Sequence, residues 1–202
     1  MTEEKISPQE SFRLIQSMID KTRQSLTNNS FYFLLWGWLV FTAALLHFSL
    51  MKFTDFAYPY IVWNLMWVGA VASIIKGIKM GKTETVKTYI SDTMKYFGIS
   101  IGIIYAGLVF IFSQLQLWEF AYPVYILVYA VTCFFMGSIM QFPFLKWAGL
   151  SCLGIMIASV YAGYEWQLLL MALAVLISYV IPGHILNAKY RRQNVGYKPA
   201  EK

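Results

Sequence analysis

Apolar residues gather into six long runs along the chain, and most charged residues lie between these runs or at the chain's ends. A helix that crosses the ~30 Å hydrocarbon core of a bilayer needs roughly 20 apolar residues, within a range of about 17–25. Six segments come close to this length without containing Asp, Glu, Lys or Arg: residues 31–51, 57–75, 97–113, 121–140, 147–162 and 166–186. The pattern predicts an all-α integral membrane protein with six transmembrane helices.

The composition points to the same class of protein. Of the 202 residues, 58% are hydrophobic and 13% are charged, whereas a soluble domain averages about 45–50% apolar and about 25% charged residues. A soluble protein this poor in charge would expose large apolar patches and would associate. The composition therefore favours a membrane protein.

The positions of the positive charges predict the orientation of the spans. With the N-terminus in the cytoplasm, fifteen of the sixteen Lys and Arg residues lie on the cytoplasmic side, and only Lys52 lies on the other side. Cytoplasmic loops of membrane proteins carry such an excess. We therefore expect both termini in the cytoplasm and the chain in the inner (cytoplasmic) membrane. The net charge of +6 then reports topology, and nucleic acid is not an expected partner.

Two polar segments flank the expected membrane domain, which covers residues 30–188. The first, residues 1–29, predicts a cytosolic amphipathic helix, since Ser7 and Glu10 match a capping box and Pro8 suits the first helical position. Asn28-Asn29 is the expected break before the first span. Residues 8–27 would lie on lipid, on the rest of this chain, or on another membrane or cytosolic protein. The second segment, residues 189–202, is expected to be a basic, disordered tail.

Two short sequence matches predict an internal repeat. Residues 55–59 read Asp-Phe-Ala-Tyr-Pro, and residues 119–123 read Glu-Phe-Ala-Tyr-Pro. Residues 95–103 and 146–155 also share a pattern, in which Lys and an aromatic residue precede Gly, an aliphatic residue and Ser. The first match relates the second span to the fourth, and the other relates the third span to the fifth. Together they predict three tandem hairpins, at about 31–76, 95–141 and 146–186, repeated in parallel around the membrane normal.

The repeated pentapeptide allows two interpretations. As a structural element it would start a helix at the outer face, because an acid near a helix N-terminus meets the positive end of the dipole and Pro suits the first turn. As a functional element it would form a rim around the outer mouth of the repeats. The residues that would then bind a ligand are Asp55, Tyr58, Glu119 and Tyr122.

Small residues recur every four positions in two spans. Such spacing lets membrane helices approach closely, so it predicts packing within this chain or, alternatively, against another subunit such as a second copy. The positions are Gly69, Ser73 and Gly77 in the second span and Gly98, Gly102 and Ala106 in the third.

Polar residues inside membrane spans are candidate functional residues, and this sequence has few of them. Asn64 lies between Trp63 and Trp67, and it predicts either a hydrogen bond between helices or a ligand or pore contact formed with the two tryptophans. His184 follows Pro182-Gly183 and could be an interfacial residue, a gate or a pH sensor. His47 lies toward the outer end of the first span, and Gln141 ends the fourth.

Motifs for chemistry are missing from the sequence. It has no His-Glu-x-x-His, Cys-x-x-Cys or phosphate-binding loop, and its one Gly-x-Ser-x-Gly match, residues 98–102, lies inside an apolar run without the strand-to-helix turn of that motif. We expect no catalytic residue, no metal site and no cofactor. Cys133 and Cys152 lie in apolar runs and are expected to be small buried hydrophobic residues.

The first fifty residues resemble the start of small multipass bacterial membrane proteins of unknown function. The resemblance is carried by "LIQSMIDKTRQSL", an amphipathic segment, followed by "SFYFLLWGWLVFTAALLHF", a span that contains Trp-Gly-Trp. It implies a bacterial cytoplasmic membrane, and it implies no activity or ligand. The sequence therefore leaves two hypotheses: a non-enzymatic scaffold or regulatory subunit, and a small transporter or channel for an apolar or uncharged solute with its route near Trp63, Asn64 and Trp67.

Overall fold

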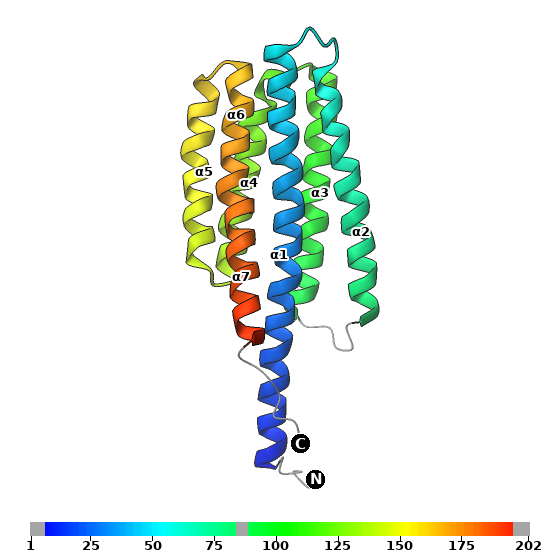
Figure 1. Ribbon diagram of the computed structural model, residues 1–202, viewed down its shortest axis with the longest axis vertical. Coiled ribbons are helices and arrows are strands. Elements are labelled where there is room, and N and C mark those ends of the chain that lie inside the picture. The colour runs from blue at the N-terminus through cyan, green and yellow to red at the C-terminus, as the bar shows by residue number, and fades with distance from the viewer. Residues whose placement is uncertain (1–6, 84–88, 196–202) are drawn as a thin grey trace.

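The computed structural model describes residues 7–83 and 89–195, and every regular element in these residues is a helix. Six helical segments are long and apolar enough to cross a membrane: Ser30–Phe53, Pro59–Lys79, Lys95–Leu115, Trp118–Ile139, Pro143–Tyr161 and Tyr164–Ala188. They stand side by side along one axis (Figure 1). The structure confirms the predicted all-α class and the six apolar spans.

The elements follow the chain as a series of long helices with short helical pieces between them. They are α1 (Pro8–Phe53), η1 (Pro59–Asn64), α2 (Leu65–Thr83), α3 (Tyr89–Leu115), η2 (Trp118–Phe120), α4 (Ala121–Ile139), α5 (Pro143–Tyr161), α6 (Tyr164–Val175), η3 (Leu176–Val180) and α7 (Ile181–Val195). Helix α1 begins and α7 ends at the same end of the bundle (Figure 1). We call this end the terminal side and the opposite end the far side.

Helix α1 is continuous over 46 residues and projects beyond the bundle on the terminal side (Figure 1). The expected break at Asn28-Asn29 is therefore wrong. Asparagine disfavours a helix by less than ~1 kcal/mol per residue, and once a helix has formed on both sides, propagation through two such residues costs little. The predicted cytosolic helix and the first span are thus one continuous helix, and Phe12 on its projecting part is 67% exposed.

The tightest helix packing lies between α4 and α5. A Cβ atom added to Gly149 would stand 2.8 Å from the carbonyl oxygen of Ala130 and 2.8 Å from the backbone nitrogen of Phe134. A Cβ on Gly137 would stand 2.7 Å from the backbone nitrogen of Lys146. Two glycines, one from each helix, therefore let the backbones touch, which is how helices gain contact where lipid supplies no hydrophobic drive.

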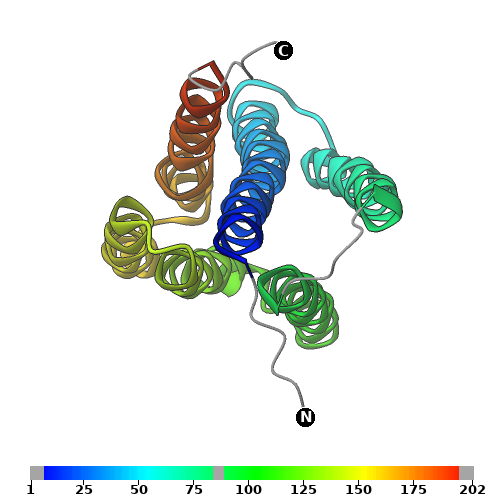
Figure 2. The same cartoon turned by 90° about the horizontal axis from the view of Figure 1, so that it is seen from below.

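Helix α1 packs closely against the sixth span, which α6, η3 and α7 form together. Figure 2 shows α1 between this span and α2, with α3, α4 and α5 completing the bundle. Gly37 faces the Val180 backbone, and a Cβ there would lie 3.2 Å from that nitrogen; Gly183 faces the side chain of Leu34. Ala43 and Ala44 are fully buried on the same helix. Small residues thus line this interface as well.

The sixth span contains a π-helical turn, and the two cysteines bond to its backbone. In η3 the N–H of Ile181 bonds to the carbonyl of Leu176, five residues back. Pro182 has no N–H to donate to the Ser178 carbonyl four residues earlier, and the Cys133 thiol, at 3.1 Å, donates to that carbonyl instead. Cys152 donates to the Ala174 carbonyl at 3.6 Å. The cysteines are buried as expected, and both thiols also donate to backbone carbonyls of this span, Cys133 within the π-helical turn and Cys152 just before it.

Helices α2 and α3 lie at the edge of the bundle (Figure 2). Only 6% of the most apolar stretch of each is buried, compared with 50% in the fourth and sixth spans. Aromatic rings carry the contact between α3 and α4: Phe97 stacks on Phe135 at 4.8 Å between centroids, and Tyr105 lies 5.4 Å from Tyr125. Large side chains therefore separate these two backbones.

Two glutamines in left-handed conformation close helices at the turns on either side of α4. Gln116 has φ 56° and Gln141 has φ 49°. In each turn the following N–H reaches back five residues, from Leu117 to Phe112 and from Phe142 to Gly137, as in a Schellman motif. Gln141, which the sequence marks as a polar residue at the end of a span, thus closes the end of α4.

The basic segment that follows the last span is helical in part. Helix α7 continues to Val195, so residues 189–195 of the segment expected to be disordered belong to a helix. Basic residues in the last turns of a helix meet the negative end of its dipole, which favours this extension. The rest of the predicted tail, residues 196–202, lies outside the described residues.

Candidate functional site

A buried histidine lies at the far side of the bundle, where four elements converge. His47 of α1 is only 2% exposed. The indole Nε1 of Trp63 in η1 donates a hydrogen bond to His47 Nδ1 at 3.0 Å, and the hydroxyl of Tyr122 in α4 lies 3.0 Å from the same nitrogen. The hydroxyl of Tyr164 in α6 lies 3.4 Å from that of Tyr122. We call these four residues the His47 cluster.

The donors around His47 decide its protonation. An indole N–H can only donate, so Nδ1 must carry a lone pair, and the imidazole proton must lie on Nε2. The Tyr122 hydroxyl can then donate to the same lone pair and accept from Tyr164. A proton on Nδ1 would face the Trp63 N–H directly, so this arrangement holds a neutral imidazole.

Proline-led helix starts place two members of the cluster, Trp63 and Tyr122. Pro59 opens η1 and Pro123 lies in the first turn of α4, and proline suits a first helical turn because its missing N–H would have no partner there. These helix starts bring Trp63 and Tyr122 within 6.0 Å, ring to ring, and Tyr122 within 5.3 Å of Tyr164. The cluster thus ties together the far-side ends of the first, second, fourth and sixth spans.

An ion pair links α1 to α6 at the same end of the bundle. Lys52 Nζ lies 2.9 Å from a carboxylate oxygen of Glu165, next to Tyr164. Both side chains are considerably exposed, at 50% and 39%. Exposed pairs of this kind contribute little, about 0–1 kcal/mol, so the buried hydrogen bonds of the His47 cluster are the stronger connection.

The chemistry open to the His47 cluster is limited by its partners. The hydrogen bonds described above come from aromatic N–H and O–H groups, and none of them involves a carboxylate, thiol or aliphatic hydroxyl. Among the residues that the structure describes, no group of three His, Cys, Asp or Glu side chains could hold a metal ion. The cluster is therefore suited to fixing helix positions with buried polar bonds that lipid cannot replace.

The predicted ligand or pore residues are not brought together. Trp63 belongs to the His47 cluster. The next residue, Asn64, is exposed, and Trp67, four residues after Trp63, is 73% exposed. His184 is also exposed, with its ring 6.2 Å from that of Trp38, edge to face.

The two copies of the pentapeptide have different surroundings. Tyr122 is buried at 4% exposure, but the matching Tyr58 is 59% exposed, and both acids, Asp55 and Glu119, are exposed. Glu119 lies in the first turn of η2, whereas Asp55 comes four residues before η1 begins at Pro59. The expected place of both acids at a helix start is therefore wrong for Asp55, because residues 54–58 are not helical and the helix begins only where Pro59 sets a helical φ.

The small residues of α2 face α1. A Cβ on Gly69 would lie 2.6 Å from the Leu39 side chain, and Ser73 accepts a hydrogen bond from the Trp36 indole at 3.1 Å. Gly77 is exposed, and the closest atom to a Cβ there is the Tyr32 hydroxyl at 3.8 Å. The contact between α1 and α2 is therefore polar as well as close.

The small residues of α3 face open space instead. A Cβ on Gly98, Gly102 or Gly107 would meet nothing within 4 Å, and Ala106 is exposed. The same type of pattern thus packs within the chain on α2 and is uncovered on α3.

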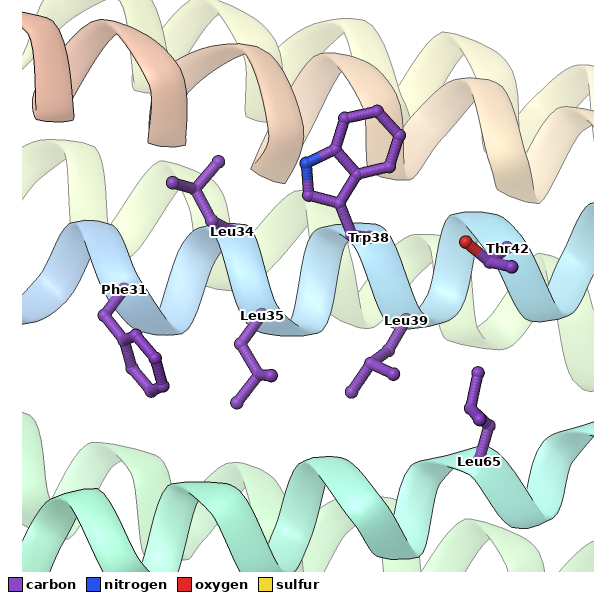
Figure 3. A pocket seen from close by; sticks show the side chains of 7 residues that line it. All are labelled: Phe31, Leu34, Leu35, Trp38, Leu39, Thr42 and Leu65. Carbon is purple, nitrogen blue, oxygen red and sulfur yellow. The ribbon is translucent and has the colours of Figure 1, made fainter.

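A groove runs along the exposed side of α1. It measures about 420 Å³ and is open to its surroundings. Figure 3 shows Leu34 and Trp38 pointing toward the sixth span, and Phe31, Leu35 and Leu39 pointing toward α2, from which Leu65 points back toward the Leu39 end of the groove. Thr42 supplies the one hydroxyl in the lining.

Sequence reasoning did not make His47 or Tyr164 site residues. The sequence did indicate how deep in the membrane each residue lies. His47 is near the end of the first span, and Trp63, Tyr122 and Tyr164 are near the starts of the second, fourth and sixth spans. All four positions therefore share one end of the bundle. Depth alone does not show which side chains point inward, so the cluster needed the structure.

No family model, curated protein or solved structure matches this chain. The functional argument therefore rests on the geometry of the chain itself.

Proposed function

We propose that this chain is a non-enzymatic scaffold or regulatory subunit of the membrane, which binds a transmembrane helix through the small-residue side of α3. The observation that carries the proposal is the open space beside Gly98 and Gly102, with Ala106 exposed one turn further along the same side of the helix. The matching pattern on α2 is covered by α1, with Gly69 under the Leu39 side chain. One of the two patterns is therefore used inside the chain, and the other is available to a partner.

Physical chemistry favours a helix as the occupant of this surface. Lipid tails are as apolar as leucine, so membrane helices associate through close packing, and small residues permit the closest approach. A second copy of α3 is the simplest partner, since a two-fold axis would place Gly102 against itself. The projecting part of α1, residues 8–27, would offer a second contact with a membrane or cytosolic protein.

The orientation belongs to the same proposal. We place both termini in the cytoplasm of a bacterial cell and the chain in its inner membrane. Support comes from the fifteen Lys and Arg residues on the side of the termini and the single Lys52 on the other. Cysteine labelling from outside intact cells tests this, because a Thr54→Cys variant would be labelled and a Lys95→Cys variant would not.

The three-hairpin repeat is also part of the proposal. It is supported by the two sequence matches, at residues 55–59 with 119–123 and residues 95–103 with 146–155. The short 3-10 pieces that open the second and fourth spans, η1 and η2, agree with a common origin. The different exposure of Tyr58 and Tyr122 would then reflect later divergence.

Association of the purified chain in lipid nanodiscs or liposomes tests the proposed function. We expect dimers that persist as the protein is diluted in lipid, and we expect Gly102→Leu to abolish them while the monomer still folds and unfolds cooperatively. Gly154→Leu in α5 is the matched control, since a Cβ there also meets nothing within 4 Å. Equal dimerisation of wild type and Gly102→Leu would refute a role for α3, and a solute-specific rise in melting temperature that Asn64→Ala removes would favour the transporter hypothesis.

A further inference from the structure

The groove on α1 has the form of a site for one apolar chain. Its walls are formed by Leu34 and Trp38 on one side and by Phe31, Leu35 and Leu39 on the other (Figure 3). Trp38 stands against the edge of the His184 ring. The Trp36–Ser73 hydrogen bond holds α2 beside α1. The groove is thus formed by side chains whose helices are already tied together.

The length of the groove matches one leaflet of a bilayer. Its lining extends along α1 from Phe31 to Thr42, a distance of about 16 Å at ~1.5 Å per residue. Half of the hydrocarbon core is about 15 Å. Phe31 lies close to the terminal-side end of the first span, which starts at Ser30. The groove therefore reaches from the terminal-side surface to about the midplane, which suits a lipid tail and does not provide a route across the membrane.

A cation stands at the surface end of the groove. Lys76 Nζ lies over the Phe31 ring at 5.3 Å from its centroid, and Phe31 is the first residue of the lining. A lysine ammonium binds phosphate as a point charge, and one basic residue near an anionic membrane surface contributes about 1 kcal/mol. A lipid with its tail in the groove would bring its head group to this lysine.

We propose that the groove between α2 and the sixth span binds an anionic phospholipid from the leaflet on the side of the termini. Its acyl chain lies along Leu35, Leu39 and Trp38, and its phosphate meets Lys76. The site is independent of the α3 surface, because the groove and the glycines of α3 share no residue. A lipid held here would also reinforce the attachment of α2 to α1.

Native mass spectrometry of the full chain with phosphatidylglycerol and phosphatidylcholine of identical chains tests the proposal. We expect one retained phosphatidylglycerol and a preference over phosphatidylcholine that falls roughly fivefold in Lys76→Gln, as expected for ~1 kcal/mol. Lys95→Gln is the matched control, since Lys95 also lies over a ring, that of Tyr96, at 5.7 Å but away from the groove. Leu35→Trp should fill the groove and lower retention of both lipids, whereas Ile103→Trp on the exposed side of α3 should not.

Other results would overturn the lipid site. Equal losses in Lys76→Gln and Lys95→Gln would mean diffuse attraction to the membrane surface. Unchanged retention in folded Leu35→Trp would mean that no tail lies in the groove, and loss of a dimer in that variant would make the occupant a second copy. If Leu35→Trp does not fold, quenching by brominated lipids replaces it: brominated phosphatidylglycerol should quench Trp38 more than brominated phosphatidylcholine, with Trp38→Phe as the reference. Equal quenching would reject the proposal.

Discussion

Helices α3 and α4 are consecutive spans, yet they pack in opposite ways. Half of the most apolar stretch of the fourth span is buried, against 6% of the third. Gly137 on α4 touches the α5 backbone, whereas the glycines of α3 touch nothing and its contacts are made by rings such as Phe97. Both spans are apolar enough for a membrane, so hydrophobicity does not explain the difference.

The comparison shows what decides packing in this chain. In a bilayer an apolar surface gains little by moving from lipid to protein, so close backbone approach and buried hydrogen bonds select the neighbours. The α4–α5 contact has the first, and the His47 cluster supplies the second. In the described residues around its glycines, helix α3 has no close backbone contact and no buried hydrogen bond to another helix. This surface of α3 is therefore available to lipid or to a partner.

The most severe test of the comparison is a large side chain at Gly149. Leucine there would drive its Cβ into the Ala130 carbonyl and the Phe134 backbone, both at 2.8 Å. Because backbone atoms cannot move aside as a side chain can, we expect a loss of at least about 3 kcal/mol, at or beyond the upper end of overpacking effects. Unfolding by denaturant in detergent micelles would measure it.

The control for Gly149→Leu lies on the same helix. Gly154→Leu places the same side chain where nothing lies within 4 Å, and we expect no loss of stability and a gain of up to about 1 kcal/mol from helix propensity. Similar losses in both variants would mean that α5 does not depend on close approach to α4.

Removal of the imidazole tests the buried hydrogen bonds. His47→Leu leaves the Trp63 N–H without its acceptor, while the Tyr122 hydroxyl can still pair with Tyr164. One unsatisfied buried donor costs about 1–3 kcal/mol, so we expect a loss of stability in that range.

A double-mutant cycle separates this hydrogen bond from packing. Trp63→Phe removes the donor, and the loss in the double variant with His47→Leu should be smaller than the sum of the two single losses. Additive losses would contradict the assigned bond.

Alanine at two glycines compares the edge helices directly. In the monomeric chain, Gly102→Ala on α3 meets open space and should gain up to about 1 kcal/mol from helix propensity. At Gly69 on α2 the same change places a Cβ 2.6 Å from the Leu39 side chain, and we expect the gain to be cancelled or reversed, because Leu39 must move. Thermal unfolding of both variants provides the comparison, and equal shifts would remove the distinction between α2 and α3.

The sequence was sufficient for the spans but not for their neighbours. Runs without charge locate the six spans, because the cost of charge in lipid constrains every position. Small-residue spacing indicates that a helix can approach another closely, as at Gly69 and Gly102, but it does not say which helix it meets. Gly137 of α4 faces α5, and Gly149 of α5 faces α4. Neither glycine belongs to a four-residue repeat of glycines in its own helix, so the sequence pattern does not mark this contact. His47 meets Trp63 and Tyr122 through long-range packing, which no local pattern encodes.

The smallest expected effect concerns the two left-handed turns that flank α4. A left-handed backbone costs a non-glycine residue about 1–2 kcal/mol. Glycine removes this cost but has greater conformational freedom in the unfolded chain, which offsets part of the gain, so Gln141→Gly should stabilise the α4–α5 turn by about 0.5–1 kcal/mol. Gln116→Gly should gain less, since the Gln116 side chain donates to the Ser113 carbonyl at 2.6 Å and glycine cannot. The Gln116 turn joins the loosely packed α3 to α4 in the core. Gln116→Gly should therefore protect backbone amides of α3 from hydrogen exchange more than it raises the overall melting temperature. Equal effects of the two glycines on global stability would show that α3 unfolds together with the core, and the contrast between the two spans would then be one of packing geometry without a difference in stability.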